Sequence, residues 1–257
     1  ADLEIMVRQF GYGGLKISKG LGLGVRDGYG ALIPVDDPRL FPLWAKAGEL
    51  GVPVFIHTAD PAAFWLPVTP ENERYAELSL HPTWSFAGPE FPARLELLRQ
   101  LERVFAAFPQ TRFVSVHMGN NAEDLDDVAR VLRTYPNVYV DIAARVPEFG
   151  RHPADEVHAF FIEFQDRILF ATDLQFSSRR GRTAYTLGSG GAEPNTREEV
   201  APFYAAHRQY FETNERQIVH PTPIQGDWRV DAIGLPADVL DKVYYLNAHR
   251  LVLERRP

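Results

Sequence analysis

The chain has 257 residues, of which 45% are hydrophobic and 24% charged, and its formal net charge is −7. This composition is typical of a globular protein and excludes a disordered or fibrous chain. The negative charge disfavours nucleic-acid binding, and no apolar run reaches the roughly 18–20 residues of a membrane span. The absence of cysteine excludes disulfides, thiolate metal ligands and cysteine nucleophiles, which leaves histidine and carboxylate side chains for metal binding and acid–base chemistry.

The chain opens with Ala1 and an amphipathic stretch to Phe10, which looks like the end of a helix and has no feature of a signal peptide. A start inside a secondary-structure element predicts a chain that is incomplete at its N-terminus. With neither a signal peptide nor a membrane segment, we expect a cytoplasmic protein. Its expected partner is a small-molecule substrate, with no nucleic acid and no membrane.

Short apolar runs alternate with stretches of helical period, which is the pattern of βα units around a parallel sheet. The runs are continuously hydrophobic, which indicates strands buried on both faces. The five runs are residues 14–18, 52–57, 113–117, 138–142 and 168–173. Helices are expected between them, around residues 38–50, 97–108, 121–132 and 157–164.

The character of the chain changes after the fifth run. Residues 174–195 are rich in Gly, Ser and Arg without a clear period, which predicts a long mobile loop. Two helices are expected at about 196–213 and 236–254. We therefore predict a single domain over residues 1–257, with 174–235 forming a long loop and helical insertion after the last strand.

Three of the runs end in a residue that can bind a metal ion or move a proton: His57, His117 and Asp173. Because active sites of parallel α/β proteins lie at the carboxyl ends of strands, these side chains are expected to share one site. Imidazole and carboxylate together suit a divalent ion such as Zn²⁺, which activates a bound water and polarises a carbonyl. The structural alternatives are that His57 and His117 are ordinary core histidines and that Asp173 only caps a helix. Asp141, near the same end of its run, is interpreted as a supporting or loop-forming carboxylate.

Other residues are weaker candidates for substrate binding. Lys16 lies inside the first run and needs an anionic partner if its side chain faces the interior. Arg145 and Arg179 follow strand ends and are candidates to hold a substrate carboxylate, although solvated loop arginines are common. Trp84 is a candidate pocket wall, or merely packs a loop. The sequence lacks dinucleotide-binding and phosphate-loop spacings and a Gly-x-Ser-x-Gly elbow, so nucleotide binding and serine-hydrolase chemistry are not expected.

Four motifs and the C-terminal helix resemble the amidohydrolase-related family of the amidohydrolase superfamily, the branch with aminocarboxymuconate semialdehyde decarboxylase and lactone hydrolases. They are Val54–His57, Val114–Asn120, Val138–Asp141, Leu169–Asp173 and residues 234–251. The resemblance implies a TIM (β/α)₈-type barrel of metal-dependent hydrolases, in which the five runs correspond to strands 4 to 8.

The resemblance also implies roles for three residues. His57 would be a metal ligand, and His117 would act on the metal-bound water or the substrate. Asp173 would be both a metal ligand and a proton acceptor. The implied cofactor is a divalent metal ion, zinc first and manganese as the alternative.

The sequence departs from the family at the first strand, which supplies a closely spaced pair of metal ligands. No two of the eight histidines of this chain are two positions apart. This favours a chain without strands 1 to 3, in which His57 and Asp173 alone bind Zn²⁺ weakly and catalysis by this chain alone is in question. It also leaves an unclosed sheet edge, which makes a homo-oligomer an option.

The leading hypothesis is a metal-dependent hydrolase that acts on a small carboxylated or cyclic substrate, of the lactone or amide type, through a metal-activated water. A non-oxidative decarboxylase of the same family is the first alternative. A non-catalytic barrel used for ligand binding is the second. The third is a metal-free enzyme in which His117 is the base and Lys16 or Arg145 binds the anion.

Overall fold

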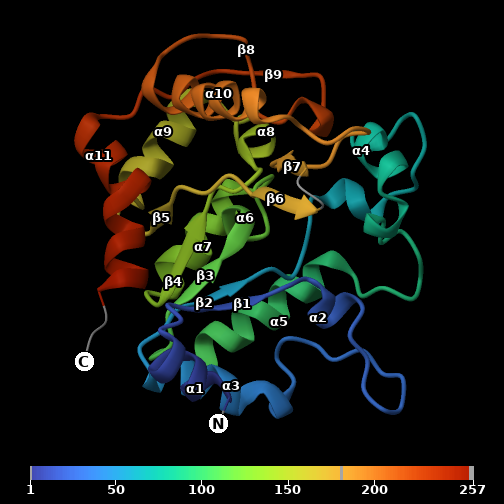
Figure 1. The fold of residues 1–257 in the computed structure, drawn as a ribbon, viewed down its shortest axis with the longest axis vertical. Coiled ribbons are helices and arrows are strands. Elements are labelled where there is room, and N and C mark those ends of the chain that lie inside the picture. The colour runs from blue at the N-terminus through green and yellow to red at the C-terminus, as the bar shows by residue number, and fades with distance from the viewer. Residues whose placement is uncertain (1, 180–181, 255–257) are drawn as a thin grey trace.

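A parallel five-stranded sheet forms the centre of the molecule in the computed structural model, which describes residues 2–179 and 182–254 (Figure 1). The strand order is β1-β2-β3-β4-β5, so consecutive strands are neighbours. The bounds are β1 (Leu15–Ile17), β2 (Val54–Ile56), β3 (Phe113–Ser115), β4 (Val138–Asp141) and β5 (Ile168–Leu169). Each strand lies within one of the predicted apolar runs, which confirms the α/β class and the parallel sheet.

The register of the sheet brings the strand ends to one edge. Ile17 pairs with Ile56, Ile56 with Ser115, and Ser115 with Val140, so the residues that follow these strands emerge side by side. In the described part of the chain, β1 and β5 are the two edge strands. The described sheet is therefore open, and an eight-stranded barrel remains a prediction.

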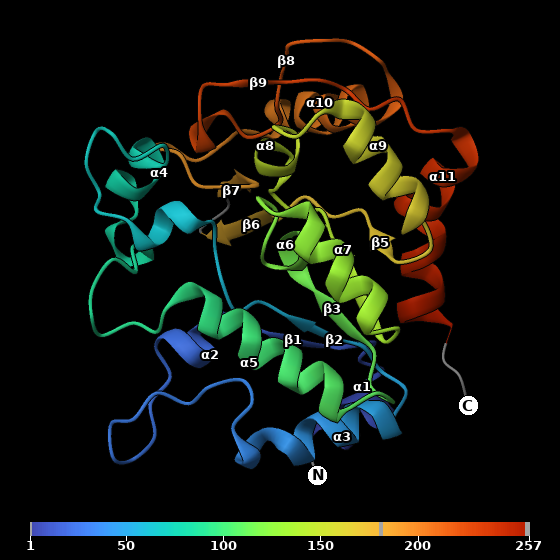
Figure 2. The same cartoon turned by 180° about the vertical axis from the view of Figure 1, so that it is seen from behind.

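Helices cover the sheet, and Figure 2 shows α5, α7 and α9 along one of its faces. In α7, Leu125, Val128, Ala129 and Leu132 are buried at helical spacing, and the Asp124 carboxylate caps the helix by accepting from the amide of Asp127. The longer helices are α1 (Asp2–Phe10), α3 (Phe41–Glu49), α5 (Arg94–Ala107), α7 (Leu125–Thr134), α9 (Ala154–Glu163) and α10 (Val200–Glu212). The short ones are α2 (Gly20–Leu23), α4 (Tyr75–Leu80), α6 (Val116–Gly119), α8 (Val146–Phe149) and α11 (Ala237–Asp241).

The C-terminal helix closes the β5 side of the sheet. After α11 it continues in wider π-helical turns, Lys242–Leu246 and His249–Leu253. The buried Asn247 amide donates to the carbonyls of Gln165 and Ile168 at 2.7 and 2.8 Å. Single 3₁₀ turns occur at Pro38–Leu40, Ala62–Trp65, Pro82–Trp84, Arg197–Glu199 and Pro223–Gln225. The helices expected around residues 196–213 and 236–254 are thus present.

The segment after β5 differs from the prediction. Strands β6 (Leu174–Arg179) and β7 (Arg182–Leu187) pair in antiparallel orientation as a hairpin, so the expected long loop is wrong for this part. A second ribbon pairs β8 (Ile218–Val219) with β9 (Arg229–Val230). The first hairpin gives no strand signal because its residues are mostly polar and exposed, whereas the central strands are apolar. No described helix has the length and apolar character to cross a membrane.

Candidate active site

A cavity of about 430 Å³ opens where the central strands end. Six of the seven predicted site residues line it, namely Lys16, His57, Trp84, His117, Arg145 and Asp173. The seventh, Arg179, ends β6, and its side chain lies outside the described part of the structure. Residues from all five central strand ends therefore meet at one cavity. The hairpin β6–β7 and its following loop contribute Gln175, Thr186 and Ser189 to the wall.

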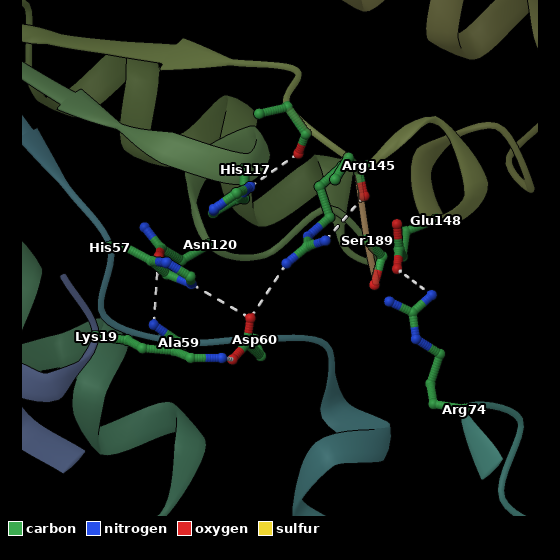
Figure 3. Close-up of polar contacts among 12 residues, drawn as sticks. Lys19, His57, Ala59, Asp60, Arg74, His117, Asn120, Arg145, Glu148 and Ser189 are labelled. Carbon is green, nitrogen blue, oxygen red and sulfur yellow. Dashed lines mark hydrogen bonds and ion pairs between the residues drawn. The ribbon is translucent and has the colours of Figure 1, made fainter. Parts of the chain in front are cut away.

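The two predicted histidines are in contact. The His57 and His117 rings lie edge to face with their centroids 4.3 Å apart. The Nδ1 atom of His117 is 2.8 Å from the carbonyl oxygen of Ala143, which accepts a hydrogen bond only if Nδ1 carries the proton (Figure 3). The lone pair of His117 is therefore on Nε2. Burial, with the nearby Arg145 and His57, holds the pKa of His117 well below its usual value, so the ring is neutral near pH 7.

The backbone at this site has unusual conformations. His117, Met118 and Asn120 have φ angles of 56°, 52° and 59°, and Ala144 and Asp173 have 52° and 55°. Of the described non-glycine residues, only Gln217 shares this left-handed conformation. Such conformations cost free energy and collect at functional sites, where surrounding contacts hold them in place. Here the Asp141 carboxylate accepts from the amides of His117 and Ala143, at 2.8 and 3.2 Å, which agrees with its predicted loop-forming role.

Asn120 joins the loops that carry the two histidines. Its side-chain oxygen accepts from the amide of Thr58 at 2.8 Å and from the amide of Ala59 at 3.2 Å, the second of which is drawn in Figure 3. Its Nδ2 donates to the Ser115 hydroxyl at 3.0 Å. The side chain is buried, so these bonds fix the loop after β2 against the turn after β3.

Asp60 is a site residue that the sequence analysis missed. Its buried carboxylate lies 3.2 Å from His57 Nε2 and 3.2 Å from the Arg145 guanidinium, and it forms an ion pair with Lys19 (Figure 3). Burial by itself raises the pKa of a carboxyl, but Lys19, His57 and Arg145 together hold the pKa of Asp60 well below its usual value. Burial lowers the pKa of His57 in spite of Asp60.

Lys19 is the second missed residue, and aromatic rings surround its ammonium group. The rings of Trp84, Phe86 and Phe64 lie 5.3, 5.4 and 5.7 Å from Nζ, within cation–π range. Trp84 also stacks on His81, with ring centroids 4.0 Å apart. The predicted pocket wall at Trp84 is therefore an aromatic surface that also holds a lysine.

A buried ion network stands beside Arg145. The Arg74 guanidinium contacts Glu77 at 2.9 Å and Glu148 at 3.0 Å, and each of these side chains is at most 2% exposed. Glu77 also accepts from the Ser189 hydroxyl, which ties the loop after β7 to α4. Charges buried this deeply need partners, so the network fixes the outer wall of the cavity.

Lys16 lies in β1 and Asp173 follows β5, the two edge strands of the sheet, and both residues line the cavity. Neither side chain has an ion-pair partner among the described residues, whereas Arg145 is paired with Asp60. Burial lowers the pKa of Lys16, opposed by the charges of Asp141 and Asp173. Burial raises the pKa of Asp141. Lys16 is thus the cation with the greatest freedom to meet a ligand anion.

The cavity holds three side chains of the types that bind divalent metal ions, His57, His117 and Asp173. Two neutral imidazoles and a carboxylate have the right chemistry, but a catalytic divalent site needs at least three converging protein ligands. Among residues 2–179 and 182–254, no group of three or more His, Asp or Glu side chains is placed to hold one. The described residues therefore do not complete a metal site, and no step below is assigned to a metal.

A comparison with models of known protein families identifies the family of this chain. The family model described as "Amidohydrolase" matches residues 1–252, and this match does not support the prediction of missing N-terminal strands. The sequence matches none of the curated proteins with which it was compared.

Several solved structures are similar to this chain at low sequence identity. A dihydroxybenzoic acid decarboxylase from Polaromonas sp. JS666, with bound manganese and the inhibitor 2-nitroresorcinol, is 15% identical with a TM-score of 0.52, covering 100% of this chain and 65% of that one. An uncharacterised TIM-barrel protein from Bordetella bronchiseptica is 19% identical (TM-score 0.44, 86% of this chain). The 4-oxalomesaconate hydratase of Rhodopseudomonas palustris is 14% identical (TM-score 0.46, 98% of this chain).

The chain spans only part of the length of these proteins, 53% of the Bordetella structure and 60% of the hydratase. The family model, in contrast, extends over nearly all of this chain. The chain therefore belongs to the amidohydrolase family.

Proposed function

We propose that this chain carries the active-site wall of an enzyme that hydrolyses a small carboxylated or cyclic substrate. One observation carries the proposal: His57, His117 and Asp173, from three strand ends, line one cavity together with Lys16 and Arg145. Amidohydrolases are generally enzymes, and their family generally uses a divalent metal ion.

The residues of the chain have distinct parts in this proposal. The Lys16 ammonium binds the substrate carboxylate, and the Trp84 ring covers the substrate body. His117 Nε2 accepts a proton from the attacking water, while the water oxygen bonds to the substrate carbonyl carbon. That proton then passes to the leaving group as its bond to the carbon breaks, and Asp173 accepts the second proton of the water. Arg179, the last residue of β6, is a further proposed ligand of the substrate carboxylate.

Decarboxylation is the second candidate, since a decarboxylase shares this fold. In that reaction the bond to the carboxyl carbon breaks and carbon dioxide leaves. The remaining carbon takes a proton that His117 Nε2 has first accepted from solvent. The same cavity serves both reactions, so the products separate them.

The test is a screen of small lactones, cyclic amides and carboxylic acids, with product analysis and a carbon dioxide assay. Turnover that disappears in His117→Gln supports the proposal, and the product identifies the reaction. Ligand binding without turnover supports the non-catalytic alternative. Measured metal content, with added Zn²⁺ and Mn²⁺ in parallel, tests the cofactor prediction. Turnover unaffected by chelator, with no metal bound, favours the metal-free alternative.

A further inference from the structure

Asp60 is the one carboxylate on which the polar groups of the cavity converge. Lys19 follows β1, His57 follows β2 and Arg145 follows β4, and all three contact its two oxygens. Figure 3 shows Asp60 between the ends of these three side chains. No other described carboxylate at this cavity contacts side chains from three strand ends.

The backbone around Asp60 is held as firmly as its side chain. The Arg94 guanidinium donates to the carbonyl of Asp60 at 2.8 Å. The two preceding amides are bonded to Asn120, as described above. The carboxylate is 4% exposed, so water does not replace its protein partners. A side chain with this many fixed contacts has one orientation.

That orientation determines the proton position on His57. A carboxylate oxygen only accepts hydrogen bonds, so His57 Nε2, at 3.2 Å from Oδ1, is the donor. The lone pair of His57 is then on Nδ1. His117 has the opposite arrangement, because its Nδ1 donates to Ala143. The two touching rings thus present different nitrogens to their surroundings.

The same carboxylate keeps two cations close together. Lys19 and Arg145 both donate hydrogen bonds to the Asp60 carboxylate, and Arg145 also donates to the carbonyl of Ala144 at 2.8 Å. Without the anion, the two positive groups would repel each other in a region of low dielectric constant. The anion therefore fixes where these cations stand relative to the substrate.

We infer that Asp60 is the positioning residue of this active site, which holds His57 in its Nε2-protonated form and keeps Lys19 and Arg145 at the cavity wall. The inference rests on the proposed function for its catalytic meaning. Asp60 acts through these three side chains, and no direct contact with the substrate is assigned to it.

Histidine NMR of the uniformly ¹⁵N-labelled protein tests the role directly. Long-range ¹H–¹⁵N correlation distinguishes the two tautomers, and His57→Gln and His117→Gln assign the signals. We expect the proton on Nε2 of His57 and on Nδ1 of His117. A proton on Nδ1 of His57 in the unaltered protein overturns the inference.

Asp60→Asn has the same shape without the charge. We expect the His57 signals to move toward the Nδ1-protonated form, while the His117 signals stay in place because Ala143 holds that ring. Asp36→Asn, which removes a carboxylate paired with the exposed Arg103, is the matched control and should leave both rings unchanged. Because the amide oxygen of asparagine still accepts from His57 Nε2, Asp60→Leu, which has no acceptor, completes the comparison, and an unchanged His57 in both folded variants overturns the inference.

The double variant Asp60→Asn/Lys19→Met tests the role in case Asp60→Asn alone does not fold. If the anion keeps the cations together, removing one cation should restore a melting temperature lost in Asp60→Asn, by about 2–4 °C or more. No recovery in the double variant contradicts the role. Expected tautomers without turnover of any substrate would refute the proposed function alone, whereas turnover with the wrong tautomer would refute this inference alone.

Discussion

His57 and His117 lie in edge-to-face contact, 4.3 Å between ring centroids, although they follow different strands of the sheet. The contact exists because β2 and β3 are neighbours in register and end at the same edge. Burial keeps both rings neutral, so each offers a lone pair near pH 7. This relationship is the geometric basis of the proposed acid–base chemistry.

His117→Gln should lower turnover by about 10²–10⁴-fold, because the proton acceptor is lost while a side chain able to donate to Ala143 remains. Steady-state kinetics on a substrate from the screen measures the effect. His152→Gln, at a half-buried histidine that contacts the Glu123 carbonyl outside the cavity, is the control and should keep full activity. Equal activity of both variants would contradict the role of His117.

Arg74→Met should destabilise the fold by about 3–5 kcal/mol, because Glu77 and Glu148 would remain buried without their common partner. Urea unfolding measures the difference. The control is Arg133→Met, which removes an ion pair with Glu163 from a side chain that is 59% exposed, and should cost less than about 1 kcal/mol. Similar decreases in the free energy of unfolding for the two variants would show that the buried ion network stabilises the fold no more than an exposed ion pair does.

His207 should make the protein less stable in acid. Burial lowers its pKa to about 4 from the usual 6.5. In the unfolded chain His207 binds a proton near pH 6.5, whereas in the folded chain it stays neutral down to about pH 4. The contribution of the neutral His207 to the free energy of unfolding is therefore fully present above pH 6.5 and is lost as the pH falls toward 4. The loss is about 2–3 kcal/mol over this range.

His207→Gln should flatten this part of the pH–stability curve, measured by urea unfolding at each half pH unit. His249→Gln, at a half-exposed histidine of the C-terminal helix, should leave the curve unchanged. A His207→Gln curve with the original slope would assign the acid sensitivity to other groups.

Asp173→Gly should leave the free energy of unfolding unchanged or raise it by up to about 1 kcal/mol, because glycine relieves the left-handed backbone at φ 55°. The same change should abolish turnover, since the proton acceptor is lost. Asp126→Gly, in the first turn of α7, is the control and should destabilise by about 0.5–1 kcal/mol. Equal destabilisation of both variants would show that position 173 is not strained.

The sequence predicted the central sheet well because a buried parallel strand leaves a local signal. Runs such as 113–117 are apolar on both faces, and their last residues point to the site without any knowledge of distant contacts. His57, His117 and Asp173 could be selected in this way, whereas Lys16, Trp84 and Arg145 were weaker candidates chosen for their side-chain type; all six line the cavity. Their roles remain predictions that the experiments above test.

Asp60 and Lys19 could not be found in the same way. Each lies a few residues beyond a strand, in a loop of no particular pattern, and becomes significant only through partners far away in sequence. The ion pair between Arg74 and Glu148 was missed for the same reason, since ion pairs between distant segments leave no periodic pattern in the sequence. The hairpin of β6 and β7 was missed because its strands are too polar to differ from a loop.

The contacts of Asn120 have a mechanical consequence. One buried amide side chain bonds to the segment behind His57 and to the strand end before His117. A ligand that presses on either ring therefore acts on both loops, because Asn120 couples them. The two histidine side chains then shift together and not independently. For the proposed function, substrate selectivity would then come from how a molecule fits this rigid base of the cavity, while the surrounding walls adapt to it.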